Sequence, residues 1–484
     1  MAILHSPALW VALLVTAAIV AIAVIKRRDT PKQWGFREVV KNPIYWAELN
    51  QARREAENAA ADTKNWSDDE VSSAARHFIF DVTSSREAWG EARVLRELGD
   101  RVHQSVVEIL GNPTLYSRLI EPSNESVLPE TPFMRACDLL GNAPPESATA
   151  KIAPFLVDSS TEIRKNAALV IAKTGSPLIV PHIRRALLDS DEYVRSYALM
   201  GLEFALKRKG LATNVSTELF TDVRDLLEQG KNADNAAEIL FQFDSERAKQ
   251  YFLSPRVFRP ESPILHEVLE TLADAKASVQ RDRLLEMISA LEAEDLTYPR
   301  NYSLREALRL LGQQQNAADQ QFLTDRTAHD DADVSAGASA GLLCFHGLDG
   351  FDKRIWEAVE KAGYESLHSY QQFYIAVIVC NSEINNGGFA QYFFNSSGDH
   401  WQDALAGFEA TGSKERLALL RQAIEFFGPA GPSEDREKRQ LELSRIYKKN
   451  DGVFEELESR YYKSSENVDV LTTRFVLANP DHFR

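Results

Sequence analysis

The polar residues with the most distinctive spacing lie in one segment near the C-terminus, from Asn381 to Gly398. The ionisable residue and its amide, hydroxyl and glycine neighbours are Glu383, Asn385, Asn386, Gly387, Gly388, Gln391, Tyr392 and Asn395. Amide side chains both donate and accept hydrogen bonds, so these residues could line a polar notch that receives a partner's backbone or a small ligand. A carboxylate in such a notch could also act as an acid or a base. We call these eight residues the notch residues.

The same residue types have structural uses, and this alternative stays open. Gly387 and Gly388 allow positive φ between two helices, whereas Asn385 and Asn386 suit a cap or a turn. The aromatic residues of the segment fit a hydrophobic core, and they are Phe389, Tyr392, Phe393 and Phe394. The segment is therefore either a binding site or a structural turn.

Searches for other catalytic patterns find none. The ten histidines are scattered, and no His-x-x-x-His, Cys-x-x-Cys, Gly-x-Gly-x-x-Gly or phosphate-loop pattern occurs. No second acid, nucleophile or metal ligand accompanies Glu383 at a recognisable spacing. The sequence therefore predicts no catalytic residues, no metal and no cofactor.

Helical patterns surround the notch residues. An apolar helix is expected over 370–384, and a second begins after Ser413 with Leu417, Leu420 and Ile424 on one face. At Asn386–Phe389, Gln391–Phe393 and Asn395-Ser396 the sequence resembles the DNA-mimic protein family of bacteria, a helical domain long catalogued as of unknown function. The resemblance covers residues 350–484 and implies a compact helical domain that binds proteins.

One described behaviour of that family is competition with DNA for a transcription factor. Residues 349–484 contain 22 acidic and 16 basic residues, a difference of −6. B-DNA carries one negative charge per about 1.7 Å of its axis. Because this surface is mixed in charge, DNA mimicry remains only the lower alternative.

Charged residues recur at a fixed interval upstream. Asp158 and Arg164 return 31 positions later as Asp189 and Arg195, and a related copy contains Arg305. A period near 30 with two helical patterns per unit is typical of an α-solenoid. We expect these five residues to form a ladder that holds neighbouring repeats in register. The alternative is a row of ligand-binding residues along a groove.

The turn from Asp189 to Arg195 resembles the HEAT-repeat family in its short form, related to phycobilisome lyase repeats. The resemblance covers residues 130–346, although no clear register is visible between 211 and 298. It implies stacked helix pairs. The named lyases act on bilins, but a repeat fold does not fix a chemistry.

Composition limits the classes of partner and compartment. The formal charge is −16, which argues against direct nucleic-acid binding because such proteins depend on clustered cations. Cys137, Cys344 and Cys380 are few and far apart, so they indicate neither a disulfide framework nor a metal knuckle.

The N-terminus carries an uncharged apolar run over residues 8–25, directly followed by Lys26, Arg27 and Arg28. As a helix it would span about 27 Å, close to a bilayer core of about 30 Å. A cleaved signal peptide would need its basic residues before the run. We therefore predict a short tail over 1–7 outside, a transmembrane helix over 8–25 in a bacterial inner membrane, and a cytoplasmic body that begins with a helical membrane-proximal region over 26–129.

These patterns predict an all-α protein with one transmembrane helix, a HEAT-like α-solenoid over 130–346 and a separate C-terminal helical domain over 350–484. The leading hypothesis is a membrane-tethered, non-enzymatic adaptor or scaffold that binds unidentified protein partners and contacts lipid through residues 8–25. One alternative is an enzyme or small-molecule binder whose site contains Glu383, Asn386, Gln391 and Tyr392. The lower alternative is sequestration of a transcription factor.

Overall fold

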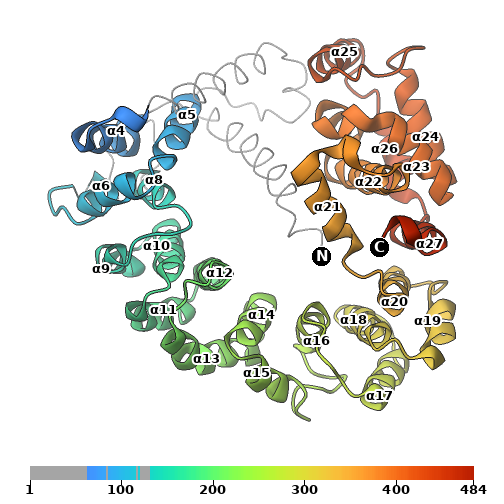
Figure 1. The fold of residues 1–484 in the computed structure, drawn as a ribbon, viewed down its shortest axis with the longest axis horizontal. Coiled ribbons are helices and arrows are strands. Elements are labelled where there is room, and N and C mark those ends of the chain that lie inside the picture. The colour runs from blue at the N-terminus through green and yellow to red at the C-terminus, as the bar shows by residue number, and fades with distance from the viewer. Residues whose placement is uncertain (1–62, 83–84, 116–117, 120–130) are drawn as a thin grey trace. The chain divides into compact units, whose positions relative to one another are not determined.

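The computed structural model describes residues 63–82, 85–115, 118–119 and 131–484 (Figure 1). These residues form α-helices and short 3-10 helices, with no strand among them, so the all-α prediction is confirmed for this part of the chain. They divide into two compact units, which we call the first unit (described residues up to Ala277) and the second unit (residues 278–484). The boundary falls inside the range predicted as solenoid. The predicted limits of the individual domains stay predictions.

The first unit consists of helix pairs. Its elements are η3 (Thr63–Asn65), α4 (Asp68–Phe80), α5 (Ser85–Arg96), α6 (Asp100–Leu110), α8 (Thr131–Leu139), α9 (Ser147–Ile152), η4 (Ala153–Val157), α10 (Thr161–Thr174), η5 (Pro177–Ile179), α11 (Val180–Leu187), α12 (Glu192–Lys207), α13 (Thr213–Glu228), α14 (Ala233–Phe243), α15 (Ser245–Phe252) and α16 (Leu265–Asp274). From α9 onward, successive helices alternate between two layers (Figure 1). One layer contains α10, α12, α14 and α16, and the other contains α9, α11, α13 and α15. This alternation is the helix-pair repeat that the 31-residue period predicts.

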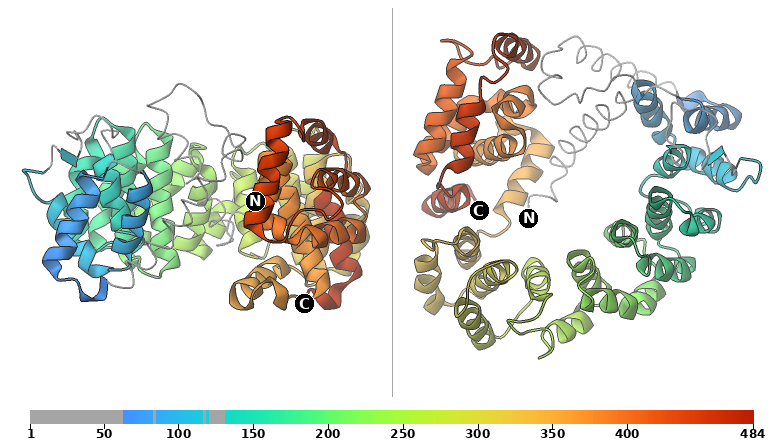
Figure 2. Two further views of the ribbon diagram at one scale, coloured as in Figure 1. Left: turned by 90° about the horizontal axis from the view of Figure 1, so that it is seen from above. Right: turned by 180° about the vertical axis from the view of Figure 1, so that it is seen from behind.

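The second unit contains two further helix pairs and a helical bundle. Figure 2 draws this unit in yellow to red. The pairs are α17 (Arg281–Glu292) with α18 (Arg300–Gln313), and α19 (Gln320–Arg326), preceded by η6 (Ala317–Asp319), with α20 (Ala332–Phe345). The bundle consists of α21 (Phe351–Ala362), η7 (Tyr364–Ser366), α22 (Ser369–Phe394), η8 (Ser396–His400), α23 (Trp401–Thr411), α24 (Lys414–Glu425), α25 (Arg436–Lys449), α26 (Glu455–Lys463), α27 (Val468–Ala478) and η9 (Pro480–His482). Helix α22 contacts α23, α25, α26 and α27 and so lies at the centre of the bundle.

Small residues let helices of one layer approach closely. A Cβ atom on Gly201 of α12 would lie 2.6 Å from the Cβ of Ala172 on α10. On α18, a Cβ atom on Gly312 would lie 2.0 Å from the carbonyl oxygen of Gly341 on α20. Both distances are far below van der Waals contact, so these crossings require glycine.

Aspartates shape the turns between the helices. The Asp189 carboxylate accepts a hydrogen bond from the backbone N of Asp191 at 2.9 Å, which folds the turn. Asp191 is the N-cap of α12 and accepts from the backbone N of Tyr193 at 2.9 Å. Asp331 caps α20 in the same way, through the backbone N atoms of Asp333 and Val334. Aspartates of the turns therefore cap the helices that follow them, and in α12 the cap is the second aspartate of the turn.

No helix among the described residues is both long and apolar enough to cross a membrane. The longest, α22, has 26 residues, but it carries polar side chains such as Gln371, Asn381 and Glu383 and departs from helical geometry at Gly387 and Gly388. The prediction of a single-pass membrane protein is therefore corrected. The segment on which it rested, residues 8–25, lies outside the described residues, as do the predicted tail over 1–7 and the start of the region over 26–129.

Candidate functional site

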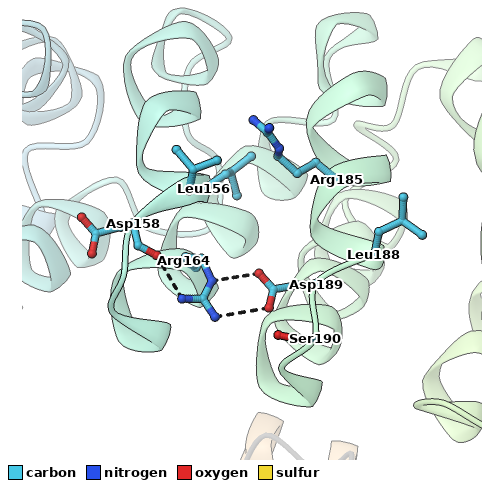
Figure 3. Close-up of a pocket in the computed structure, with 8 residues that line it drawn as sticks. Leu156, Asp158, Arg164, Arg185, Leu188, Asp189 and Ser190 are labelled. Carbon is cyan, nitrogen blue, oxygen red and sulfur yellow. Dashed lines mark hydrogen bonds and ion pairs between the residues drawn. The ribbon is translucent and has the colours of Figure 1, made fainter.

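The predicted ladder begins with Arg164 at the start of α10. Its guanidinium donates to both carboxylate oxygens of Asp189 in the next repeat, at 2.8 and 3.2 Å (Figure 3). It also donates to the carbonyl oxygens of Asp158 and Ser159 in its own turn, at 3.0 and 3.1 Å. The Asp189 carboxylate in turn raises the pKa of Arg164 above its ordinary value. Arg164 therefore joins two consecutive turns.

Arg195 repeats this arrangement one unit later. It donates to the carbonyl oxygens of Asp189 and Ser190 at 2.8 and 3.0 Å, and its Nε donates to the Asn232 side chain of the following turn at 3.0 Å. Asn232, which adopts a positive φ of 48°, accepts a hydrogen bond from Arg195 as Asp189 does from Arg164 in the preceding repeat. Asn232 was not predictable from the repeat pattern, because the turn before α14 carries an amide in place of the expected carboxylate.

Arg305 does not share this geometry. It lies in α18, where its Nε is 3.3 Å from Glu306 and its Nη1 is 3.7 Å from Asp333 of α20. Other pairs connect the repeats of the second unit. Arg281 contacts the buried carboxylate of Asp319 at 2.9 and 2.5 Å, and Arg326 contacts Glu292 at 2.6 and 2.9 Å.

An open pocket of about 640 Å³ lies beside the Arg164–Asp189 ion pair. Its lining residues are Leu156, Val157, Asp158, Arg164, Arg185, Leu188, Asp189 and Ser190 (Figure 3). Val157 and Leu188 are 31 positions apart and therefore occupy equivalent places in successive repeats, and they are 60% and 85% exposed. The exposed guanidinium of Arg185 comes from α11. The pocket thus combines apolar walls with a cation.

In the C-terminal bundle, Glu383 collects the polar groups of the predicted notch. The amides of Gln391 and Asn395 donate to its Oε2 at 2.7 and 3.0 Å. Burial raises the pKa of Glu383, and hydrogen bonds from Gln391, Asn395 and Ser397 only partly offset that effect. Gln391 is itself buried. Three notch residues are therefore brought together, and they bond to one another.

Tyr392 points into the core rather than toward these residues. Its side chain is 1% exposed, and burial together with the neighbouring Cys380 thiol raises the pKa of its hydroxyl well above the ordinary value. The neighbouring aromatics Phe389, Phe393 and Phe394 are buried to the same degree. The structural interpretation of these four aromatics, as core residues, agrees with their burial.

Gly387 and Gly388 mark a break inside α22. Gly388 has φ 79° and ψ −177°, a conformation that is essentially restricted to glycine. Glu458 of α26 accepts a hydrogen bond from the backbone N of Phe389 at 3.0 Å and so caps the second half of the helix. The Tyr462 hydroxyl donates a hydrogen bond to the carbonyl oxygen of Ile384 at 2.9 Å and so caps the C-terminal end of the first half of α22. Asn385, Asn386 and Gly387 are exposed at the break.

The C-terminal end of α22 is held by a buried cation. Arg439 of α25 is 0% exposed and donates to the carbonyl oxygens of Phe393 and Asn395 at 2.7 and 3.0 Å. It also pairs with the Asp399 carboxylate. A cation at this position satisfies the free carbonyls of the helix end and opposes the helix dipole. Sequence reasoning missed Arg439, Glu458 and Tyr462 because each acts on a helix far away in the chain.

Two further findings bear on chemistry. Among the residues that the structure describes, no three His, Cys, Asp or Glu side chains gather in a group that could hold a metal ion. The three cysteines are buried and form no disulfide with one another, and burial raises the pKa of the Cys137 and Cys380 thiols.

Two parts of the chain match models of known families. Residues 134–203 match the model described as HEAT repeats, and residues 365–479 match the model described as DMP19-like protein. Both resemblances drawn from the sequence are thereby confirmed. Among curated proteins, none matches the chain.

Proposed function

We propose that this protein is a non-enzymatic protein-binding scaffold, in which the HEAT-like solenoid and the C-terminal bundle each supply a binding surface. The two family matches support this role, because stacked helix pairs present extended surfaces to partners. Two binding surfaces on one chain would also allow two partners, or two parts of one partner, to be held together.

The observation that carries the proposal is the pocket at the repeat turns. Val157 and Leu188 leave their apolar side chains in water at equivalent places of two successive repeats, although burial would stabilise each by about 1.5–3 kcal/mol. Arg185 lines the same pocket. Arginine is one of the residue types that contribute most to protein interfaces, and a partner that binds here would also remove the exposed apolar side chains from water.

The bonding of the notch residues favours this function over a small-molecule site. The Glu383 carboxylate already accepts hydrogen bonds from the side-chain amides of Gln391 and Asn395, so a ligand would have to displace both of these bonds. Tyr392 could reach such a ligand only if the core opened. What remains exposed is a short row of backbone and amide groups at Asn385, Asn386 and Gly387, which suits contact with a protein surface.

A charge-substitution experiment on the full-length chain tests the proposal. Affinity capture with quantitative mass spectrometry would compare wild type, the double variant Val157→Glu/Leu188→Glu, and Leu441→Glu as a control. Leu441 lies on α25 and is 42% exposed, so this control changes an exposed leucine away from the repeats. We expect the double variant to lose specific proteins that the control retains, while circular dichroism remains unchanged. Identical protein sets from all three chains would contradict a binding role for this pocket.

A further inference from the structure

Helix α25 carries a positive charge within an otherwise acidic bundle. Its residues, 436–449, include six basic and two acidic side chains, a difference of +4. The other residues of 349–484 include ten basic and 20 acidic side chains, a difference of −10. Figure 1 shows α25 at one edge of the bundle, where it packs on α22 and η8. More than a third of the basic residues of this domain are therefore gathered on one edge helix.

The two sides of α25 differ in composition. The packed side includes Arg439, Leu443 and Tyr447, which are buried. Intervals of three and four positions place a second set of residues on the opposite side, where all of them are exposed. We call this set the α25 cationic face, and it consists of Lys438, Leu441, Arg445, Lys448 and Lys449.

The cations of this face are not neutralised by neighbouring carboxylates. Arg445, Lys448 and Lys449 form no ion pair with any residue that the structure describes. Lys438 lies 3.8 Å from the Asp435 carboxylate, but the two side chains are 73% and 51% exposed, and an ion pair so open to water is weak. The dipole of α25 would favour lysines in its last turn, but it does not account for Arg445.

The surroundings of the face limit the class of anion that can bind it. Screening in physiological salt extends over about 8 Å, so a nucleic acid or an anionic bilayer laid on α25 would also meet the exposed carboxylates beside it, such as Glu434 and Glu437. An acidic segment of a protein can contact the cations alone. Leu441 is 42% exposed among these cations and offers an apolar contact that a phosphate backbone cannot use.

We propose that the α25 cationic face binds an acidic segment of a partner protein, rich in glutamate or aspartate and containing apolar residues. Carboxylates of the segment pair with the four cations, and an apolar side chain covers Leu441. The guanidinium of Arg445 suits a carboxylate because it can donate two parallel hydrogen bonds. This inference rests on the proposed scaffold function, and it assigns the binding surface of the C-terminal bundle and the chemistry of one partner segment.

The test uses a dye-labelled synthetic peptide of about 12 residues, composed of glutamate and leucine, which is long enough to follow the face over about 16 Å. Fluorescence anisotropy measures its binding to the full-length protein. A control peptide has glutamine in place of glutamate. Two triple variants with the same net charge are compared, one that reverses the face and one that reverses exposed lysines of α21, α24 and α26. They are Arg445→Glu/Lys448→Glu/Lys449→Glu and Lys361→Glu/Lys414→Glu/Lys463→Glu.

We expect saturable binding of the acidic peptide to the wild type and no binding of the glutamine peptide. Reversal of the face should weaken binding at least about tenfold, whereas the control reversal should change it by less than about twofold. Raising the salt concentration from about 0.05 to about 0.3 M should weaken binding to the wild type. Because all six substituted side chains are exposed, circular dichroism of both variants should match the wild type.

Several outcomes would overturn the inference. They are the absence of saturable binding, equal weakening by the two triple variants, and equal binding of the glutamine peptide. Tighter binding of single-stranded DNA of the same charge, or of phosphatidylcholine–phosphatidylserine vesicles, with loss in the face variant alone, would assign the face to nucleic acid or to lipid instead. A loss of self-association alone, seen for the face variant by sedimentation velocity, would assign it to a second copy of the chain.

The capture experiment separates this inference from the scaffold proposal. Leu441→Glu places a carboxylate within the α25 cationic face, so it should lose an acidic partner that Val157→Glu/Leu188→Glu retains. If only Val157→Glu/Leu188→Glu loses proteins, the inference fails and the scaffold proposal stands. If neither variant loses any protein, the scaffold proposal fails as well.

Discussion

Replacing Gly388 with alanine should destabilise the C-terminal bundle more than an ordinary glycine substitution does. Two separate effects add at this position. The backbone has φ 79° and ψ −177°, which costs a residue with a Cβ atom about 1–3 kcal/mol. The new Cβ atom would also lie 2.1 Å from Oε1 of Glu458, so the carboxylate that caps Phe389 would have to move away.

Loss of that cap adds about 1–2 kcal/mol, the usual contribution of a side chain that caps a helix N-terminus. The expected total is therefore about 2–5 kcal/mol. Gly412 provides the matched control, because it also has φ 79° but has open space around its missing Cβ atom. For Gly412→Ala we expect only the backbone cost of about 1–2 kcal/mol.

Pulsed hydrogen exchange with mass spectrometry along a urea series would measure these changes. The method reports peptides from each unit separately, which matters because a chain with two units need not unfold in one transition. For Gly388→Ala, peptides from α22 and α26 should lose protection at lower urea, while peptides from the first unit keep the midpoint of the wild type.

A double-mutant cycle separates the two effects. In a Glu458→Ala background the carboxylate is absent, so Gly388→Ala should cost only the backbone contribution. If Gly388→Ala costs the same with and without Glu458, the cap is not coupled to the glycine and the reasoning is wrong. If Gly388→Ala is as mild as Gly412→Ala in the wild-type background, the helix break is not held in the way described.

Three other predictions concern single charged groups. Asp189→Ala should lower the free energy of unfolding of the first unit by about 1–3 kcal/mol, because Arg164 loses its carboxylate partner. As a control, Asp222→Ala removes the partner of Arg184 at an exposed ion pair and should cost less than about 1 kcal/mol. Urea titration measures both changes. Burial raises the pKa of Glu466, but the hydrogen bonds that it accepts at the start of α24 outweigh this effect and lower its pKa below 4.5. The stability that Glu466 contributes should therefore be lost as pH falls through the lowered pKa. In acid titrations, Glu466→Gln should make this part of the stability profile flatter. The pKa of Glu383 is raised, so its contribution to stability is present below pH 4.5 and is lost as pH rises through the raised pKa. Glu383→Gln should therefore increase the melting temperature at pH 7 but not at pH 4.

The repeat architecture was predictable from the sequence because it depends on local spacing. The interval of 31 positions between Asp158 and Asp189 and between Arg164 and Arg195 indicates the helix pairs, but it does not indicate that Arg195 reaches the side chain of Asn232 in the following turn. Arg305 shows where such reasoning ends, since a similar local pattern there leads to contacts with Glu306 and Asp333 instead. A ladder needs a partner in the next turn, and a motif of five residues does not reveal that partner.

The notch residues were identifiable as unusual, but their geometry was not predictable. What organises them comes from distant parts of the chain, namely Glu458 and Tyr462 at the break in α22 and Arg439 at its end. These are long-range contacts of single side chains, and they leave no periodic signal in the sequence. The membrane prediction failed for a different reason, because it relied on the composition of one short segment and on no contact with the rest of the fold.

The guanidinium contacts of the ladder do not continue along the whole of the first unit. Arg195 lies six positions after Asp189, and the residue six positions after Asn232 is Glu238, so the series of guanidinium contacts cannot continue into α14. Glu238 instead accepts a hydrogen bond from the side-chain amide of Gln242 on the same helix at 2.8 Å. Substitution of Glu238 by alanine should therefore lower the free energy of unfolding of the first unit by less than Asp189→Ala does, which urea titration of both variants would measure.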